Sequence, residues 1–146
     1  MLKKIVVPVD GSENSMRAVD YALEIGKKFE SELTVVNVVP PPDQVNEIMN
    51  KLGAARVKEA ETEDRAKQAL NLAEARVKER GGYEKVKYTS LEGIDPAETI
   101  IQVADAQGAD TIVIGNRGLG TLSALILGSV SGQLIQSSKI PVLMVK

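Results

Sequence analysis

The chain has 146 residues and a formal net charge of -2, with 43% hydrophobic and 26% charged residues. This size and balance favour one globular domain over residues 1–146 and argue against partners such as nucleic acid or a membrane surface. The sequence contains no cysteine and no histidine, which excludes disulfides, thiol nucleophiles, Cys/His zinc sites and a Ser-His-Asp triad. No apolar run is long enough to span a membrane and no signal peptide precedes Met1, so we expect a cytoplasmic protein.

The first half of the chain alternates between apolar runs and helical patterns. Residues 5–9 form a continuous apolar run, as expected of a strand that is covered on both faces. A turn follows, and Ser12 is expected to cap a helix whose buried stripe extends to Phe29. A second buried strand is expected at residues 33–39, where three prolines end it. A long polar helical region should then run from about residue 43 to 80.

The second half continues the same alternation. Apolar and polar residues alternate over residues 86–91, which predicts an outer strand with partial exposure. Asp95 as N-cap and a proline directly after it begin a helix that Gly108 ends. Strands at residues 111–114 and 140–145 complete a β-α-β-α-β-α-β-α-β order. This order predicts a doubly wound α/β fold with a parallel sheet, which binds ligands at the carboxyl ends of its strands.

A glycine-rich segment follows the strand at residues 111–114 and leads into a helix. Its glycines allow the backbone to approach an anion closely, and the first N–H groups of a helix that begins at Gly128-Ser129 could bind phosphate. A tight connection would explain one or two glycines, but four spaced positions at a helix start favour phosphate binding. The segment matches neither the Walker A motif nor the Gly-x-Gly-x-x-Gly dinucleotide fingerprint.

The spacing Gly-x2-Gly-x9-Gly-Ser, met by Gly115, Gly118, Gly128 and Ser129, resembles the ATP-binding signature of the universal stress protein family. The resemblance covers the whole chain, including its first strand and its last. It implies a five-stranded parallel sheet in the order 3-2-1-4-5, similar to the adenine nucleotide alpha hydrolases. Asn37 is one departure, since many family members carry histidine there.

The resemblance also implies a site for ATP with Mg²⁺, in which the phosphates supply most of the metal's ligands. It assigns no side chain as a catalytic group or metal ligand. The residues that it implies as nucleotide-binding are Pro8, Val9, Asp10, Val38, Gly115, Arg117, Gly118, Gly128, Ser129, Val130 and Ser131.

Two of these residues have an alternative interpretation. Asp10 could contact the ribose, or it could form an Asx-turn that caps the first helix, and the two roles are compatible. Arg117 could bind a phosphate or point to solvent.

The function that the resemblance implies is that of an ATP-binding regulatory switch in the stress response. It also implies a homodimer joined through the strand at residues 140–145, and a regulatory protein partner of unknown identity. Two alternatives remain: a nucleotide-free dimeric interaction protein, and a slow ATPase or phosphotransferase. The lack of histidine, cysteine and a P-loop lysine argues against an efficient enzyme.

Overall fold

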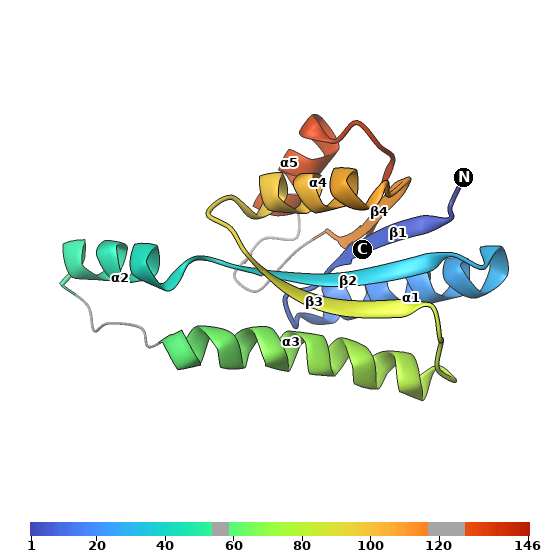
Figure 1. Ribbon diagram of the computed structural model, residues 1–146, viewed down its shortest axis with the longest axis horizontal. Coiled ribbons are helices and arrows are strands. Elements are labelled where there is room, and N and C mark those ends of the chain that lie inside the picture. The colour runs from blue at the N-terminus through green and yellow to red at the C-terminus, as the bar shows by residue number, and fades with distance from the viewer. Residues whose placement is uncertain (54–58, 117–127) are drawn as a thin grey trace.

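The computed structural model describes residues 1–53, 59–116 and 128–146. They form a five-stranded parallel sheet in the order β3-β2-β1-β4-β5, which confirms the predicted fold and strand order (Figure 1). The strands are β1 (Lys4–Pro8), β2 (Glu32–Val39), β3 (Val86–Glu92), β4 (Thr111–Gly115) and β5 (Val142–Val145). The helices are α1 (Glu13–Phe29), α2 (Pro42–Lys51), α3 (Glu59–Glu79), α4 (Pro96–Gln107) and α5 (Ser129–Ser137).

The sheet separates two hydrophobic cores. Helices α1 and α3 pack on one face of the sheet, whereas α4 and α5 pack on the other (Figure 1). Successive residues of β1 enter different cores: Ile5 and Val7 contact the α1 and α3 side, and Val6 contacts the α4 and α5 side. This double burial explains why β1 is apolar at every position instead of alternating.

The helix ends follow the predicted capping. The Ser12 hydroxyl oxygen accepts from the Ser15 N–H at 3.2 Å, and the Asp95 carboxylate accepts from the Glu98 N–H at 3.1 Å. Gly108 ends α4 in the left-handed conformation, with φ of 62°. The prediction that Phe29 is buried is wrong, because Gly26 is the last buried residue of α1 and Phe29 is 41% exposed.

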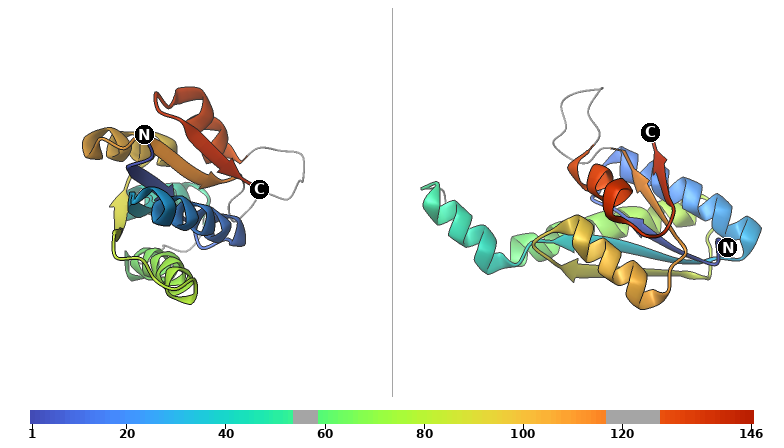
Figure 2. Two further views of the ribbon diagram at one scale, coloured as in Figure 1. Left: turned by 90° about the vertical axis from the view of Figure 1, so that its right-hand side faces the viewer. Right: turned by 90° about the horizontal axis from the view of Figure 1, so that it is seen from above.

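The described part of the polar region between β2 and β3 contains two helices. Helix α3 packs against the sheet through its small apolar residues, such as Ala69 and Ala73, which are 2% and 0% exposed. Helix α2 extends beyond the sheet (Figures 1 and 2). Strand β5 is shorter than predicted and begins at Val142, because Ile140 lies in a turn in which its N–H and C=O both bond the Ser138 hydroxyl.

An ion-pair cluster joins α1 to α3. Asp20 is 9% exposed, and its carboxylate accepts from Arg76 Nε at 2.9 Å, Arg76 Nη2 at 2.7 Å and Arg80 Nη2 at 3.0 Å. Arg76 Nη2 also contacts Glu13 Oε1 at 3.2 Å. The hydrogen bonds with Asp20 raise the pKa of the Arg76 guanidinium. Three donors converge on one largely buried carboxylate, so the cluster should fix the position of α3 on α1.

Replacing Asp20 with asparagine is expected to lower the free energy of unfolding by about 1–3 kcal/mol, since it leaves two guanidinium groups without their shared carboxylate. Urea denaturation of both proteins measures the loss. Glu13→Gln is the matched control, because its carboxylate is 70% exposed and should contribute about 0–1 kcal/mol. Equal losses in the two variants would contradict the role of Asp20.

Candidate nucleotide-binding site

The turn after β1 lies at the carboxyl edge of the sheet. Asp10 Oδ1 accepts from the Ser12 N–H at 2.9 Å, which is the Asx-turn expected as one of two compatible roles for this residue. The Asp10 N–H lies 3.4 Å from the Ser15 hydroxyl oxygen, and that hydroxyl donates to Ser12 O at 2.8 Å. These bonds fix the direction of the chain between β1 and α1 at the edge where doubly wound folds bind ligands.

Gly115, the last residue of β4, touches the first turn of α1. A Cβ atom at this position would lie 2.7 Å from the backbone C and O of Asn14 and 3.0 Å from the Ser15 backbone N. Only glycine allows this approach, because backbone atoms cannot rotate away as a side chain can. The contact brings the start of the glycine-rich segment against the turn after β1.

The two described ends of the glycine-rich segment are joined to each other. The Gly128 N–H donates to Asn116 O at 2.9 Å. The Ser131 hydroxyl lies 3.2 Å from Asn116 O and 3.1 Å from Gly128 O, and Ser131 is 2% exposed. The Ser131 hydroxyl therefore contacts both ends of the segment. Residues 117–127, which include Arg117 and Gly118, lie outside the described residues.

Helix α5 presents its N-terminus at the same edge. Gly128 is the N-cap, and no side chain of the described residues accepts from the first turn of the helix. Ser129 is exposed, and Val130 is partly buried against the core on the α4 and α5 side. An uncapped first turn carries N–H donors and a partial positive charge, which together favour an anion.

Strand β2 contributes Asn37 and Val38 beside the end of β1. Val38 packs partly buried on the α4 side of the sheet. Asn37 is 7% exposed, and its Nδ2 donates to Val9 O at 2.8 Å. From the sequence, Asn37 stood out only as a departure from the family pattern. A polar residue inside an apolar strand was the available signal, because buried amides require hydrogen-bond partners.

The structure brings most of the predicted site residues to one edge. Gly115 meets the turn after β1, and Gly128 and Ser131 lie at the end of β4 through their bonds to Asn116. Val38 lies on the neighbouring strand β2. Within residues 1–53, 59–116 and 128–146, no group of three or more His, Cys, Asp or Glu side chains could hold a metal ion. No helix in this part of the chain is long and apolar enough to cross a membrane.

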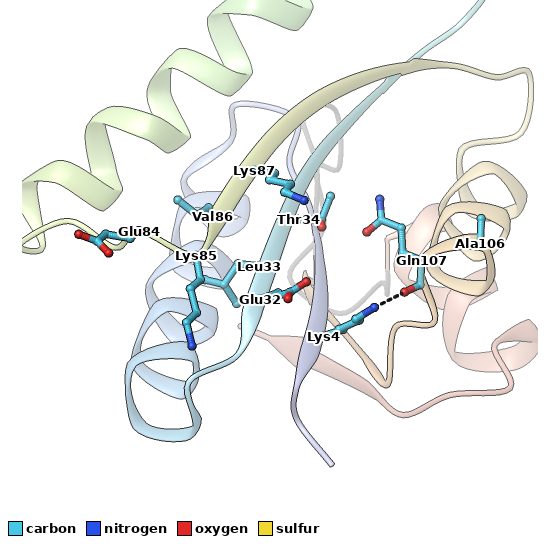
Figure 3. A pocket seen from close by; sticks show the side chains of 10 residues that line it. All are labelled: Lys4, Glu32, Leu33, Thr34, Glu84, Lys85, Val86, Lys87, Ala106 and Gln107. Carbon is cyan, nitrogen blue, oxygen red and sulfur yellow. Dashed lines mark hydrogen bonds between the residues drawn. The ribbon is translucent and has the colours of Figure 1, made fainter.

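A separate hollow of about 610 Å³ lies at the opposite, amino-terminal edge of the strands (Figure 3). Lys4, Thr34 and Lys87 line its sheet side, and the end of α4 forms its other side. Lys4 Nζ donates to Gln107 O at 3.2 Å. None of the predicted site residues lines this hollow.

Comparison with known proteins finds the same family along the whole chain. The model of the Universal stress protein family matches residues 1–146. A universal stress protein of Methanocaldococcus jannaschii is 33% identical over 153 residues, which cover 100% of this chain and 83% of that protein. A solved universal stress protein in complex with cAMP is 29% identical, with a TM-score of 0.70 over 99% of this chain and 97% of that one. Another, from Archaeoglobus fulgidus in complex with dAMP, is 26% identical, with a TM-score of 0.74 and full coverage of both chains (100%).

Proposed function

The chain belongs to the universal stress protein family, and we propose that it binds an adenine nucleotide at the carboxyl edge of its sheet. The observation that carries this proposal is the N-terminus of α5, whose first turn receives no cap from a described side chain and which Gly128 joins to the end of β4 beside the turn after β1. The two similar structures in complex with cAMP and dAMP support it, because both ligands combine adenine with phosphate.

We propose ATP with Mg²⁺ as the ligand. The backbone N–H groups of Ser129 and Val130 would bind phosphate oxygens, and Asp10 would face the ribose hydroxyls. Val38 would border the adenine. Bound Mg²⁺ would neutralise part of the phosphate charge, and the phosphates would supply most of its ligands. The close approach of Gly115 to α1 supports this arrangement, because it holds the ribose side and the phosphate side of the site together.

The nucleotide would act as a regulatory signal in the stress response. ATP binding would change the affinity for a protein partner or for a second copy of the chain, in the cytoplasm. The sequence supports regulation over catalysis, because it contains neither histidine nor cysteine, the side chains most suited to proton transfer and nucleophilic attack near neutral pH.

Two measurements test the nucleotide proposal. Denaturing the purified protein and separating the released small molecules by chromatography should yield an adenine nucleotide. Calorimetry with ATP, GTP and inorganic tripolyphosphate should then show the tightest binding for ATP. A protein that carries no nucleotide and binds none of the three would refute the proposal.

We also propose a homodimer joined through β5, and the backbone hydrogen bonds between β4 and β5 suggest a specific test. The Ile112 N–H donates to Pro141 O and the Asn116 N–H to Val145 O, so the odd-numbered residues of β5 pair with β4. The N–H of Met144 therefore faces outward, and Leu143 is 39% exposed on this edge strand. Unpaired edges invite pairing with another strand. Met144→Pro removes only an outward donor, so it should yield a monomer in light scattering.

Met144→Ala is the control for the dimer, since it shortens the side chain but keeps the N–H, and it should remain dimeric. An unaltered protein that is monomeric at micromolar concentration, with and without ATP, would contradict the proposed dimer.

A further inference from the structure

The ladder of backbone hydrogen bonds between β1 and β2 ends one bond before β2 itself ends. Its register runs from Lys4 opposite Glu32 to Pro8 opposite Val36, and the Val9 N–H then donates to Val36 O at 2.8 Å. In a regular parallel ladder the next bond would run from the Val38 N–H to Val9 O. In the described structure Val9 O instead accepts from the side-chain Nδ2 of Asn37 at 2.8 Å.

The peptide groups of Val38 face the side on which β1 has ended. Glu32 N donates to Lys3 O and Val36 O accepts from Val9 N, so even-numbered residues of β2 face β1. Odd-numbered residues face β3, since the Val39 carbonyl accepts from Gly93 N. By this alternation the Val38 N–H and C=O both point into the carboxyl-edge region beside Val9. One donor next to one acceptor complements the ring nitrogen and amino group of adenine, and it mismatches the corresponding edge of guanine.

Asn37 makes this arrangement possible, although its side chain lies on the face of the sheet opposite to the side chain of Val38. Its side chain is 7% exposed, and it follows Leu33 and Val35 on the face that packs against α1 and α3. Its Nδ2 is bonded, whereas its Oδ1 has no hydrogen-bond partner among the residues that the structure describes. A buried amide with an unsatisfied oxygen disfavours folding relative to an aliphatic residue. The hydrogen bond from the Asn37 amide to Val9 O is therefore what explains an amide side chain at this position.

We propose that Asn37 is a positioning residue for the nucleotide base. Its amide replaces the Val38 N–H as the donor to the Val9 carbonyl, and the Val38 peptide groups stay available to the ligand. The same bond orients the peptide between Val9 and Asp10, whose N–H faces the Ser15 hydroxyl. The identity of the ligand rests on the proposed function, but the replacement of one donor by another does not.

Amide hydrogen exchange of the nucleotide-free protein, followed by NMR, tests this replacement without any ligand. The Val38 N–H should exchange at least about tenfold faster than the Val36 N–H, which is paired in the ladder. In Asn37→Leu the Val9 carbonyl loses its side-chain donor, so the Val38 N–H should pair with it and become protected. A Val38 amide as protected as that of Val36 in the unaltered protein would overturn the proposal, whether or not nucleotide binds.

Binding measurements test the consequence for the ligand. Asn37→Leu should weaken ATP binding by about tenfold or more, which corresponds to the loss of about one hydrogen bond, and leave the affinity for inorganic tripolyphosphate unchanged. Equal losses for ATP and tripolyphosphate would indicate general damage to the site and overturn the proposal. If the unaltered protein binds neither, the proposed function fails while the exchange result still decides the role of Asn37.

Two further variants separate a specific donor from a merely structural residue. Asn37→His restores a side-chain N–H and should recover most of the ATP affinity. Asn37→Asp has no donor when ionised but gains an O–H when protonated, and burial raises the pKa of a carboxyl group. Its ATP affinity, measured relative to the unaltered protein, should therefore increase as the pH falls. Two results together would contradict the donor role, even if Asn37→Leu does not fold. One is a ratio of ATP affinities, between Asn37→Asp and the unaltered protein, that does not change with pH. The other is an Asn37→His variant whose ATP affinity stays well below that of the unaltered protein.

Discussion

Replacing both Gly118 and Gly128 with valine should lower the affinity for ATP by about 100-fold, which is about 3 kcal/mol. The valine side chains would keep the phosphates away from the backbone N–H groups, and each charge-assisted hydrogen bond of this kind contributes about 1.5–3 kcal/mol. Gly128 has φ of -56° and ψ of 146°, a conformation that valine also adopts, so the substitution there introduces no backbone strain. Calorimetry of the double variant measures the loss.

The matched control for the glycine variant is Gln133→Val, which adds the same side chain on α5. Gln133 is exposed and lies one turn beyond the helix start, so ATP affinity should not change. Circular dichroism and thermal unfolding should show that both variants are folded. If the double variant unfolds, the single Gly118→Val variant replaces it. Unchanged ATP affinity in the folded double variant would refute the proposed phosphate site at Gly128.

Replacing Gly115 with alanine should lower the free energy of unfolding by about 3 kcal/mol, within the range observed when buried sites are overpacked. The new Cβ would lie 2.7 Å from the backbone C and O of Asn14, so the first turn of α1 would have to move. Because this turn follows Asp10 and Ser12, ATP affinity should fall as well. Urea denaturation and calorimetry measure the two effects.

Gly26→Ala is the control for this overpacking. Gly26 is also buried, but the atoms nearest to a Cβ at this position would belong to the side chains of Leu33 and Tyr83, at 3.2 Å. Side chains can shift by a few tenths of an ångström, and alanine favours a helix over glycine by about 1 kcal/mol. The net change should therefore be much smaller than at Gly115. Similar losses at both positions would show that backbone contact is not the reason for glycine at the end of β4.

The order of strands and helices could be predicted from the residues alone, because local patterns report local structure. Continuous apolar runs identified strands buried on both faces, as Ile5, Val6 and Val7 illustrate. Capping residues such as Ser12 and Asp95 marked helix starts, since their side chains bond N–H groups only three residues away. The family resemblance added the order in which the strands lie in the sheet, which five parallel strands do not dictate.

The short-range features of the candidate site were equally accessible. The Asx-turn at Asp10 and the helix start at Gly128 each involve residues that are close in sequence. These local signals therefore predicted the turn after β1 and the start of α5. The prediction of Phe29 as buried was wrong for a related reason: periodicity gives the face on which a residue lies, but not where the covering sheet ends.

Only the tertiary structure revealed why Gly115, Asn37 and Asp20 occupy their positions. Gly115 is required by the backbone of Asn14, Asn37 bonds the carbonyl of Val9, and the carboxylate of Asp20 receives guanidinium groups from α3. Each contact joins segments that are distant along the chain, and each depends on separations of about 3 Å between groups on different elements. Residue type and periodicity carry no information about such separations, because they arise only when the helices have packed on the sheet.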